Sequence, residues 1–272
     1  MNTPDTIVLI HGLWMTAKSW EKWIERYESR GYKVIAPSWP GLEGEVEAMR
    51  RDPSPLSNLD LEKILAHYER IIRELDNPPI VIGHSFGGAF AQVLNARGLG
   101  AATVSLDGAT VRGVRDLPLS TLRSSFHVLS NPFNIRRAVP FSEKHFRYAF
   151  GNTLSEEDSR AAWQRYAVPA AARVLFQGAM ANVNPKTPLR VDFETAGRAP
   201  LLFIGGGKDH VVPAKVSRKM AAKYRKSTAV TDYKEFPTRS HFTAGEPGWE
   251  EVADFALSWA TEHANREAKV TA

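Results

Sequence analysis

The chain contains the segment Ile80-Val81-Ile82-Gly83-His84-Ser85-Phe86-Gly87-Gly88, from which the arrangement of the other elements can be worked out. Residues 80–82 are apolar and β-branched, which predicts a short buried strand. Residues 89–97 favour a helix that ends at Gly98. Ser85 is therefore expected on a sharp turn from strand to helix, where the small residues Gly83 and Gly87 relieve crowding. This context predicts a nucleophilic serine hydroxyl, and the alternative is a glycine-rich turn with an incidental serine.

The same alternation of strand and helix patterns extends on both sides of this turn. Strands are expected at residues 6–10, 33–36, 80–82, 102–106, 201–204 and 233–236. Amphipathic helices are expected at residues 20–27, 61–75, 214–224 and 249–263, and a frayed tail after them. Strands that alternate with helices indicate an α/β fold, with a mostly parallel central sheet and helices on both faces.

The alternation is interrupted by one long insertion. Residues 110–198 have no convincing buried strand, and helical patterns such as 143–150 and 156–166 are separated by prolines. We therefore predict a core formed by residues 1–109 and 199–272, with residues 110–198 as a helical cap insertion. A chain of 272 residues is long enough for this organisation.

Composition excludes several classes of function. The net charge is +5, and the basic and acidic residues are interleaved, so the charge gives no reason to expect a nucleic acid partner. The absence of cysteine excludes disulfides, thiolate metal ligands and a cysteine nucleophile. The apolar run at residues 7–10 is too short for a signal sequence or a membrane span. We expect a cytoplasmic protein, unless an export signal has been removed.

No cofactor is expected from the sequence. No histidine or carboxylate spacing indicates a metal site. The glycines at 205–207 do not open a helix, so they are not a dinucleotide fingerprint.

A serine nucleophile needs a base, and the base needs an acid that orients it. Asp209 follows the strand at residues 201–204, and His241 follows the strand at residues 233–236. Functional residues of such folds lie at the carboxyl ends of the strands. The order Ser85, Asp209, His241 is also the order expected for a catalytic triad on a strand–turn–helix serine.

These features together resemble the α/β-hydrolase family over the whole length of the chain. The segment His11-Gly12-Leu13-Trp14 is similar to the family's His-Gly loop after the first strand. The resemblance implies an oxyanion hole made by the backbone N–H groups of Leu13 and Phe86. The three-glycine loop of some lipases is absent, which argues against the large hormone-sensitive-lipase type.

Two alternative assignments remain open at this point. Asp107 also ends a strand, and some members of the family take their acid from that strand. His210 follows Asp209 and is an alternative base. His11 and His84 are expected to support their loops by hydrogen bonds, and the remaining histidines to lie on the surface or in packing positions.

The substrate pocket is expected under the cap, at the carboxyl edge of the sheet. Trp14 belongs to one oxyanion loop, and Phe126 and Phe146 lie in the insertion, so all three are candidates to line it. The simpler expectation for the aromatic residues of the insertion is that they pack the cap on the core.

The function expected from these residues is hydrolysis of small to medium carboxylic esters by a serine esterase. Lactone opening, C–C hydrolysis, perhydrolysis and cyanohydrin cleavage by a hydroxynitrile lyase use the same residues and remain alternatives. A non-catalytic ligand receptor on this fold is the alternative from another class, because fold alone does not decide function. The oligomeric state and the natural substrate are left open.

Overall fold

A computed structural model of the protein describes residues 4–270 and shows a six-stranded sheet. The strands are β1 (Thr6–Ile10), β2 (Lys33–Ile35), β3 (Ile80–His84), β4 (Ala102–Leu106), β7 (Leu201–Gly206) and β8 (Thr231–Phe236). Their order is β2-β1-β3-β4-β7-β8, and every neighbouring pair is parallel. The predicted α/β architecture is confirmed. Parallel pairing brings the carboxyl ends of all six strands to one edge, where the predicted site residues follow them.

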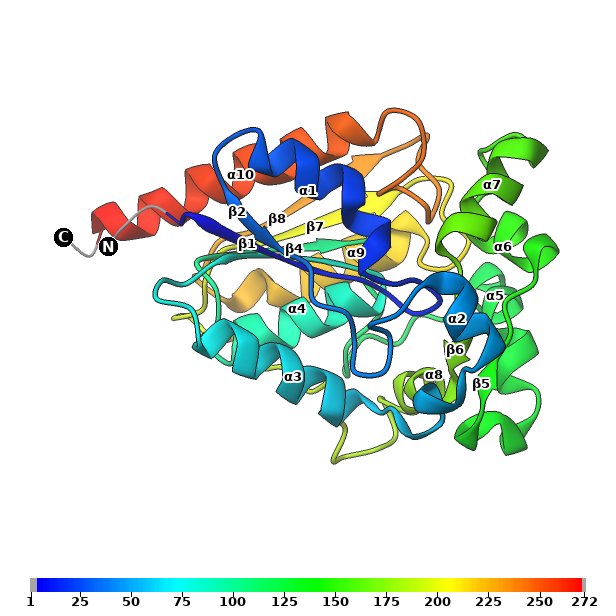
Figure 1. The fold of residues 1–272 in the computed structure, drawn as a ribbon. Coiled ribbons are helices and arrows are strands. Elements are labelled where there is room, and N and C mark those ends of the chain that lie inside the picture. Colours follow the sequence, from blue (N-terminus) through cyan, green and yellow to red (C-terminus); the bar gives the residue numbers. More distant parts are fainter. Residues whose placement is uncertain (1–3, 271–272) are drawn as a thin grey trace.

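Helices cover both faces of the sheet (Figure 1). The short η1 (Ala17–Trp20), α1 (Glu21–Glu28) and α10 (Trp249–Val270) contribute to one hydrophobic layer. The helices α3 (Leu61–Arg73), α4 (Phe86–Ala96) and α9 (Ala214–Lys223), the last followed by η4 (Tyr224–Lys226), contribute to the other layer.

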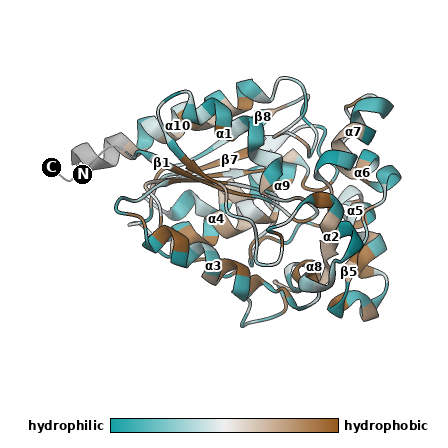
Figure 2. Cartoon of the chain, viewed as in Figure 1, coloured by the Kyte–Doolittle hydropathy of each residue, from teal (hydrophilic) through white to brown (hydrophobic). Residues whose placement is uncertain are grey.

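Side-chain alternation along the strands explains the two layers. In β1, Ile7 and Leu9 pack in the layer of α1 and α10, whereas Val8 and Ile10 pack in the layer of α3 and α4. All four side chains are buried. Each buried side chain of this kind contributes roughly 1.5–3 kcal/mol to folding. A strand that is buried on both faces needs an unbroken apolar sequence, as β1 has (Figure 2).

The helices of the predicted insertion lie beyond the carboxyl ends of the strands (Figure 1). Its last residues run back along the core, where the Phe193 ring lies 5.0 Å from the ring of Tyr224. Its helices are α5 (Leu119–Leu129), η3 (Pro132–Arg136), α6 (Glu143–Ala149), α7 (Glu156–Tyr166) and α8 (Ala172–Ala179). Several hydrogen bonds connect it to core loops. Among them, Asn152 Nδ2 donates to the Lys208 carbonyl at 2.9 Å, and the Val168 N–H donates to the Trp14 carbonyl at 2.8 Å.

Three local expectations differ from the structure. The last helix continues to Val270 instead of ending near residue 263, while residues 271 and 272 lie outside the described residues. The segment 37–59, whose Pro, Gly and Ser residues predict a long loop with at most one short helix, holds two short helices, α2 (Val46–Arg51) and η2 (Ser54–Asn58). The insertion also contains a pair of two-residue antiparallel strands, β5 (Ala138–Val139) and β6 (Ala170–Ala171). Pairs this short leave no periodic signal in a sequence.

Within residues 4–270, no helix has both the length and the apolar character that a bilayer span requires.

Candidate active site

Ser85 lies on a strained turn between β3 and α4. Its backbone has φ 57° and ψ −121°, a conformation that L-residues rarely adopt and that is common at functional sites. A Cβ atom on Gly83 would lie 2.0 Å from the Gly87 carbonyl oxygen, and one on Gly87 would lie 2.1 Å from the Ile10 carbonyl oxygen. Because both obstacles are backbone atoms, side-chain movement cannot relieve them. The turn therefore requires glycine at both positions.

The loop at residues 11–14 lies directly against the serine. A Cβ atom on Gly12 would be 2.6 Å from the Ser85 Cβ and 3.2 Å from its Oγ. In the part of the chain that the structure describes, the N–H groups of Leu13 and Phe86 donate to no backbone or side-chain acceptor. Phe86 is the first residue of α4, where such unpaired donors are expected. Two N–H groups are thus available beside the serine, and their role as an oxyanion hole remains a prediction.

Hydrogen bonds of the His11 ring hold this loop in place. Its Nε2 accepts a hydrogen bond from the Trp39 N–H at 3.1 Å, so the proton is on Nδ1, which donates to the Gly12 carbonyl at 2.9 Å. Burial lowers the pKa of His11 to about 4, and the imidazole is neutral at neutral pH. The supporting role expected for His11 agrees with these contacts.

His241 and Asp209 form a buried hydrogen bond. The His241 Nδ1 lies 2.6 Å from the Asp209 Oδ2, and both side chains are inaccessible to solvent. The other carboxylate oxygen, Oδ1, accepts from the N–H groups of Val211 and Val212 at 2.6 and 2.8 Å. The carboxylate is thus oriented by backbone donors before it meets the imidazole, and it holds the Nδ1 proton so that Nε2 is free to accept one.

Burial disfavours the charged form of both side chains, so it shifts their pKa values in opposite directions. It lowers the pKa of His241 to about 3, which keeps the imidazole neutral. Burial raises the pKa of Asp209, and the N–H groups of Val212 and Val211 oppose this rise because they stabilise the carboxylate. A neutral imidazole is the form that can accept a proton from a serine.

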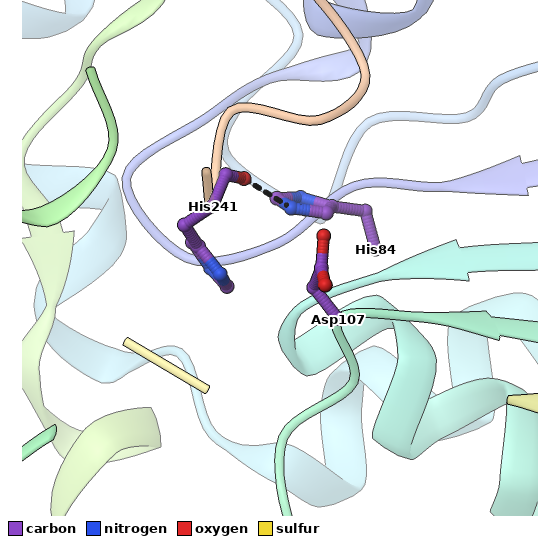
Figure 3. Close-up of side chains that lie close together, drawn as sticks. All are labelled: His84, Asp107 and His241. Atoms are coloured by element: carbon purple, nitrogen blue, oxygen red, sulfur yellow. Dashed lines mark hydrogen bonds between the residues drawn. The ribbon is translucent and has the colours of Figure 1, made fainter. Parts of the chain in front are cut away.

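The His241 Nε2 is buried and has no hydrogen-bond partner, so no hydrogen bond to Ser85 is formed in the structure. Such contacts are often long until a substrate closes the site. The residue before the serine, His84, contacts His241 instead. Its Nε2 donates to the His241 carbonyl at 2.8 Å, and the two rings lie 4.7 Å apart (Figure 3). The nucleophile turn and the histidine loop are therefore in direct contact.

Asp107, the alternative acid, lies close to the same histidine but is held differently. Its Oδ1 accepts the Gly206 N–H at 2.6 Å, while its Oδ2 is buried without a partner. Ligand atoms of His84, Asp107 and His241 lie within 4.8 Å of one another (Figure 3). Among the side chains that the structure describes, those of residues 4–264, this is the one group with the residue types and spacing that could hold a metal ion. Because the His241 Nδ1 bonds Asp209, it is Asp209, and not Asp107, that holds the imidazole.

His210, the alternative base, faces the insertion. Its Nδ1 bonds the Tyr148 carbonyl at 2.8 Å, and its ring packs 4.8 Å from the Tyr148 ring. In the part of the chain that the structure describes, the His210 ring forms no hydrogen bond with Asp209 or Ser85. This position supports a structural role for His210 at the junction of the Asp209 loop and the insertion.

One buried residue near His241 was not found by the sequence analysis. The carboxylate of Glu246 accepts from the Ser240 N–H at 2.9 Å, from the Ser240 hydroxyl at 2.8 Å and from the Thr153 hydroxyl at 2.5 Å. Ser240 precedes His241, and Thr153 belongs to the insertion. Glu246 thus connects the loop that carries His241 to the insertion. The one feature of the sequence that indicates Glu246 is that it lies five residues after His241.

A small cavity opens beside Ser85. It has a volume of about 160 Å³, and Ser85, Phe86 and Trp14 contribute to its wall. The remainder of the wall is mostly apolar and comes from residues 109–129, α8 and the segment after Asp209. Trp14 therefore lies where the sequence analysis expected it.

The other two predicted pocket residues do not line this cavity. Phe126 points outward with 68% of its surface exposed, and Phe146 is fully buried among Phe141, Phe150 and Phe242. The residues of α5 that face the cavity are Thr121, Leu122, Ser125 and Leu129. For Phe146, packing of the cap on the core is the correct interpretation.

The architecture and the strand–turn–helix serine define the class of protein to which the chain belongs. A match to the alpha/beta hydrolase family covers residues 7–255. The chain is a member of the alpha/beta hydrolase family. No curated protein matches it.

Several solved structures share the fold at low sequence identity. One is an extracellular alpha/beta-hydrolase from a Paenibacillus species, with 22% identity, a TM-score of 0.67 and coverage of 94% of this chain and 99% of that chain. A monoacylglycerol lipase from Paleococcus ferrophilus has 18% identity and a TM-score of 0.62, with 97% of each chain covered. A pyrethroid hydrolase from Sphingobium faniae JZ-2 has 23% identity, a TM-score of 0.61 and coverage of 93% and 98%. At these identities the similarity is one of fold.

Proposed function

We propose that this protein is a serine hydrolase that cleaves small to medium carboxylic esters through an acyl-enzyme. The observation that carries the proposal is the buried 2.6 Å hydrogen bond between His241 Nδ1 and Asp209 Oδ2, on a histidine whose Nε2 is unpartnered. A histidine held in this way is a general base for a serine on the adjacent turn. The solved structures that share this fold include an esterase, a lipase and a pyrethroid hydrolase, and these activities agree with this chemistry.

In the proposed reaction, Ser85 Oγ attacks the ester carbonyl carbon while His241 Nε2 takes the hydroxyl proton. The carbonyl oxygen becomes an oxyanion that accepts hydrogen bonds from the Leu13 and Phe86 N–H groups. The imidazolium, stabilised by Asp209, returns its proton to the leaving alkoxide, and the alcohol departs. A water molecule then repeats the attack on the acyl-enzyme, with His241 as the base, and releases the carboxylic acid and the free Ser85 hydroxyl.

The size of the cavity indicates which acyl groups fit. A volume of about 160 Å³ is close to that of an engineered cavity of roughly 150 Å³ that accommodates benzene. Its wall is apolar apart from a few groups such as Thr121 and Ser125. We therefore expect short, branched or single-ring acyl groups to be preferred over long straight chains.

Covalent labelling tests the nucleophile. An organophosphonate is expected to add one adduct, which peptide mass spectrometry will locate at Ser85, and the Ser85→Ala variant should remain unlabelled. An adduct on another serine, or no adduct with probes of several sizes, would refute the assignment.

Turnover tests the reaction class. On p-nitrophenyl esters from acetate to laurate, we expect many turnovers per protein molecule, with the highest kcat/KM for butyrate to benzoate. A stoichiometric release of one p-nitrophenol would indicate a receptor. A lactone or a cyanohydrin turned over faster than every ester would assign another reaction to the same residues.

A further inference from the structure

The insertion has an exposed apolar face that the proposed reaction does not explain. Six of the nine large hydrophobic side chains that are exposed in the described residues lie in the segment 117–135. We call these six the apolar patch: Leu117, Leu119, Leu122, Phe126, Phe133 and Ile135. Exposed hydrophobic residues that are gathered in this way, instead of scattered singly, mark an interaction site.

The helix α5 presents large apolar side chains to solvent. Leu119, Leu122 and Phe126 follow one another at helical spacing and face solvent, with Leu119 84% and Phe126 68% exposed. The buried residues of the same helix are Ser124, Ser125 and Val128. The adjoining η3 adds Phe133, which is 77% exposed. Figure 2 shows hydrophobic segments at this outer edge of the insertion. Burial of these side chains requires a partner outside the chain.

The charge of this segment indicates the kind of partner. Residues 117–142 include Arg123, Arg136 and Arg137 but contain no aspartate or glutamate. Arg136 and Arg137 are exposed, and they form no salt bridge with the side chains that the structure describes, those of residues 4–264. Apolar side chains flanked by unpaired arginines suit the headgroup region of an anionic membrane. A second copy of the chain fits less well, because a symmetric contact would bring the same arginines together.

The apolar patch is continuous with the cavity beside Ser85. Leu117 and Leu122 belong to both, because each is exposed at the surface and also lines the cavity. A partner bound to the apolar patch would therefore lie beside the cavity wall. An apolar molecule carried by that partner would have a short path to Ser85.

From these observations we propose that the apolar patch and its arginines dock the protein peripherally on the surface of an anionic lipid bilayer. Phe126, Phe133 and the leucines of α5 enter the headgroup boundary, and Arg136 and Arg137 contact lipid phosphates. Docking goes beyond ester hydrolysis and does not depend on it.

Vesicle co-sedimentation tests docking without any turnover. The full chain is mixed with vesicles of equimolar phosphatidylglycerol and phosphatidylcholine, or of phosphatidylcholine alone. We expect binding to the anionic vesicles, weakened by high salt. The variant Arg136→Gln/Arg137→Gln should bind about 25-fold more weakly, since each arginine near an anionic surface contributes about fivefold. Lys223→Gln/Arg225→Gln, outside the insertion, is the control for charge and should bind as the parent does.

The apolar contribution has its own matched pair of variants. Leu119→Ser/Phe126→Ser/Phe133→Ser should lose roughly tenfold or more in affinity, whereas Val230→Ser, an exposed hydrophobic residue elsewhere, should lose none. The single variant Phe126→Ser provides a milder test, and unchanged thermal unfolding will verify that each variant is folded.

Three results would overturn the proposal. They are equal sedimentation with neutral and anionic vesicles, binding that is unaffected by the patch variants, and a dimer in analytical ultracentrifugation that the triple serine variant dissociates. The Ser85→Ala variant should dock as the parent does, so failure of docking and failure of hydrolysis are separate outcomes.

Discussion

Replacement of Asp209 by asparagine tests the orientation of the imidazole most directly. In the structure, the Val211 and Val212 N–H groups both donate to Oδ1 of this residue. These N–H groups can donate only to the amide oxygen of asparagine, so the NH₂ group must face His241 Nδ1. An NH₂ group donates and cannot accept, which forces the imidazole proton onto Nε2. The base is then blocked at the atom that must take the serine proton.

The expected loss follows from that blocked atom. The same exchange in a serine protease triad costs about 10⁴-fold in kcat, equivalent to roughly 5.5 kcal/mol of transition-state stabilisation. We expect a loss of this order in Asp209→Asn, measured as kcat on p-nitrophenyl butyrate, with KM changed much less.

Asp107→Asn is the matched control for this experiment. The carboxylate of Asp107 accepts one backbone N–H, from Gly206, and its other oxygen has no partner. An asparagine can keep the one contact, so we expect a loss of less than about tenfold. Equal circular dichroism spectra and urea unfolding curves will show that both variants are folded. A larger loss in Asp107→Asn than in Asp209→Asn would refute our assignment of the acid.

Three further outcomes are expected. Burial lowers the pKa of His241, and the base must be neutral, so the acidic limb of kcat/KM should be a single ionisation below pH 6.5. His210→Ala should keep this limb, and a limb above pH 6.5 would contradict the assignment of His241 as the base. Gly87→Ala places a Cβ atom 2.1 Å from a backbone carbonyl oxygen and should destabilise the fold by about 1–3 kcal/mol in urea unfolding, so a variant as stable as the parent would contradict this reasoning. Phe146→Ala should lower the free energy of unfolding by about 3–5 kcal/mol because the side chain is fully buried. The exposed Phe126→Ala should change it by less than about 0.5 kcal/mol. Equal losses would contradict the buried position of Phe146 and the exposed position of Phe126.

The short elements α2, η2, β5 and β6 have no periodic pattern in the sequence that predicts them. Strand patterns are a local property, and the mostly apolar sequences of β1, β3 and β4 predicted these strands within a residue or two. Elements held mainly by tertiary contacts, such as β5 and β6, have no such pattern.

The sequence by itself determined the fold class, the strand–turn–helix position of Ser85, and the order of Asp209 and His241 behind later strands. Topology then requires that these residues share one edge of a parallel sheet, because every strand of such a sheet ends there. No distance is needed for that conclusion.

Only the tertiary structure decided the contacts that depend on a few ångströms of loop geometry. Asp107 and Asp209 both follow strands, yet the 2.6 Å contact with His241 is made by Asp209. The buried carboxylate of Glu246 and the outward direction of Phe126 were likewise settled by contacts between segments distant in sequence. A strand end places a side chain at an edge, but the turn that follows, and whatever packs on it, decides which atom the side chain meets.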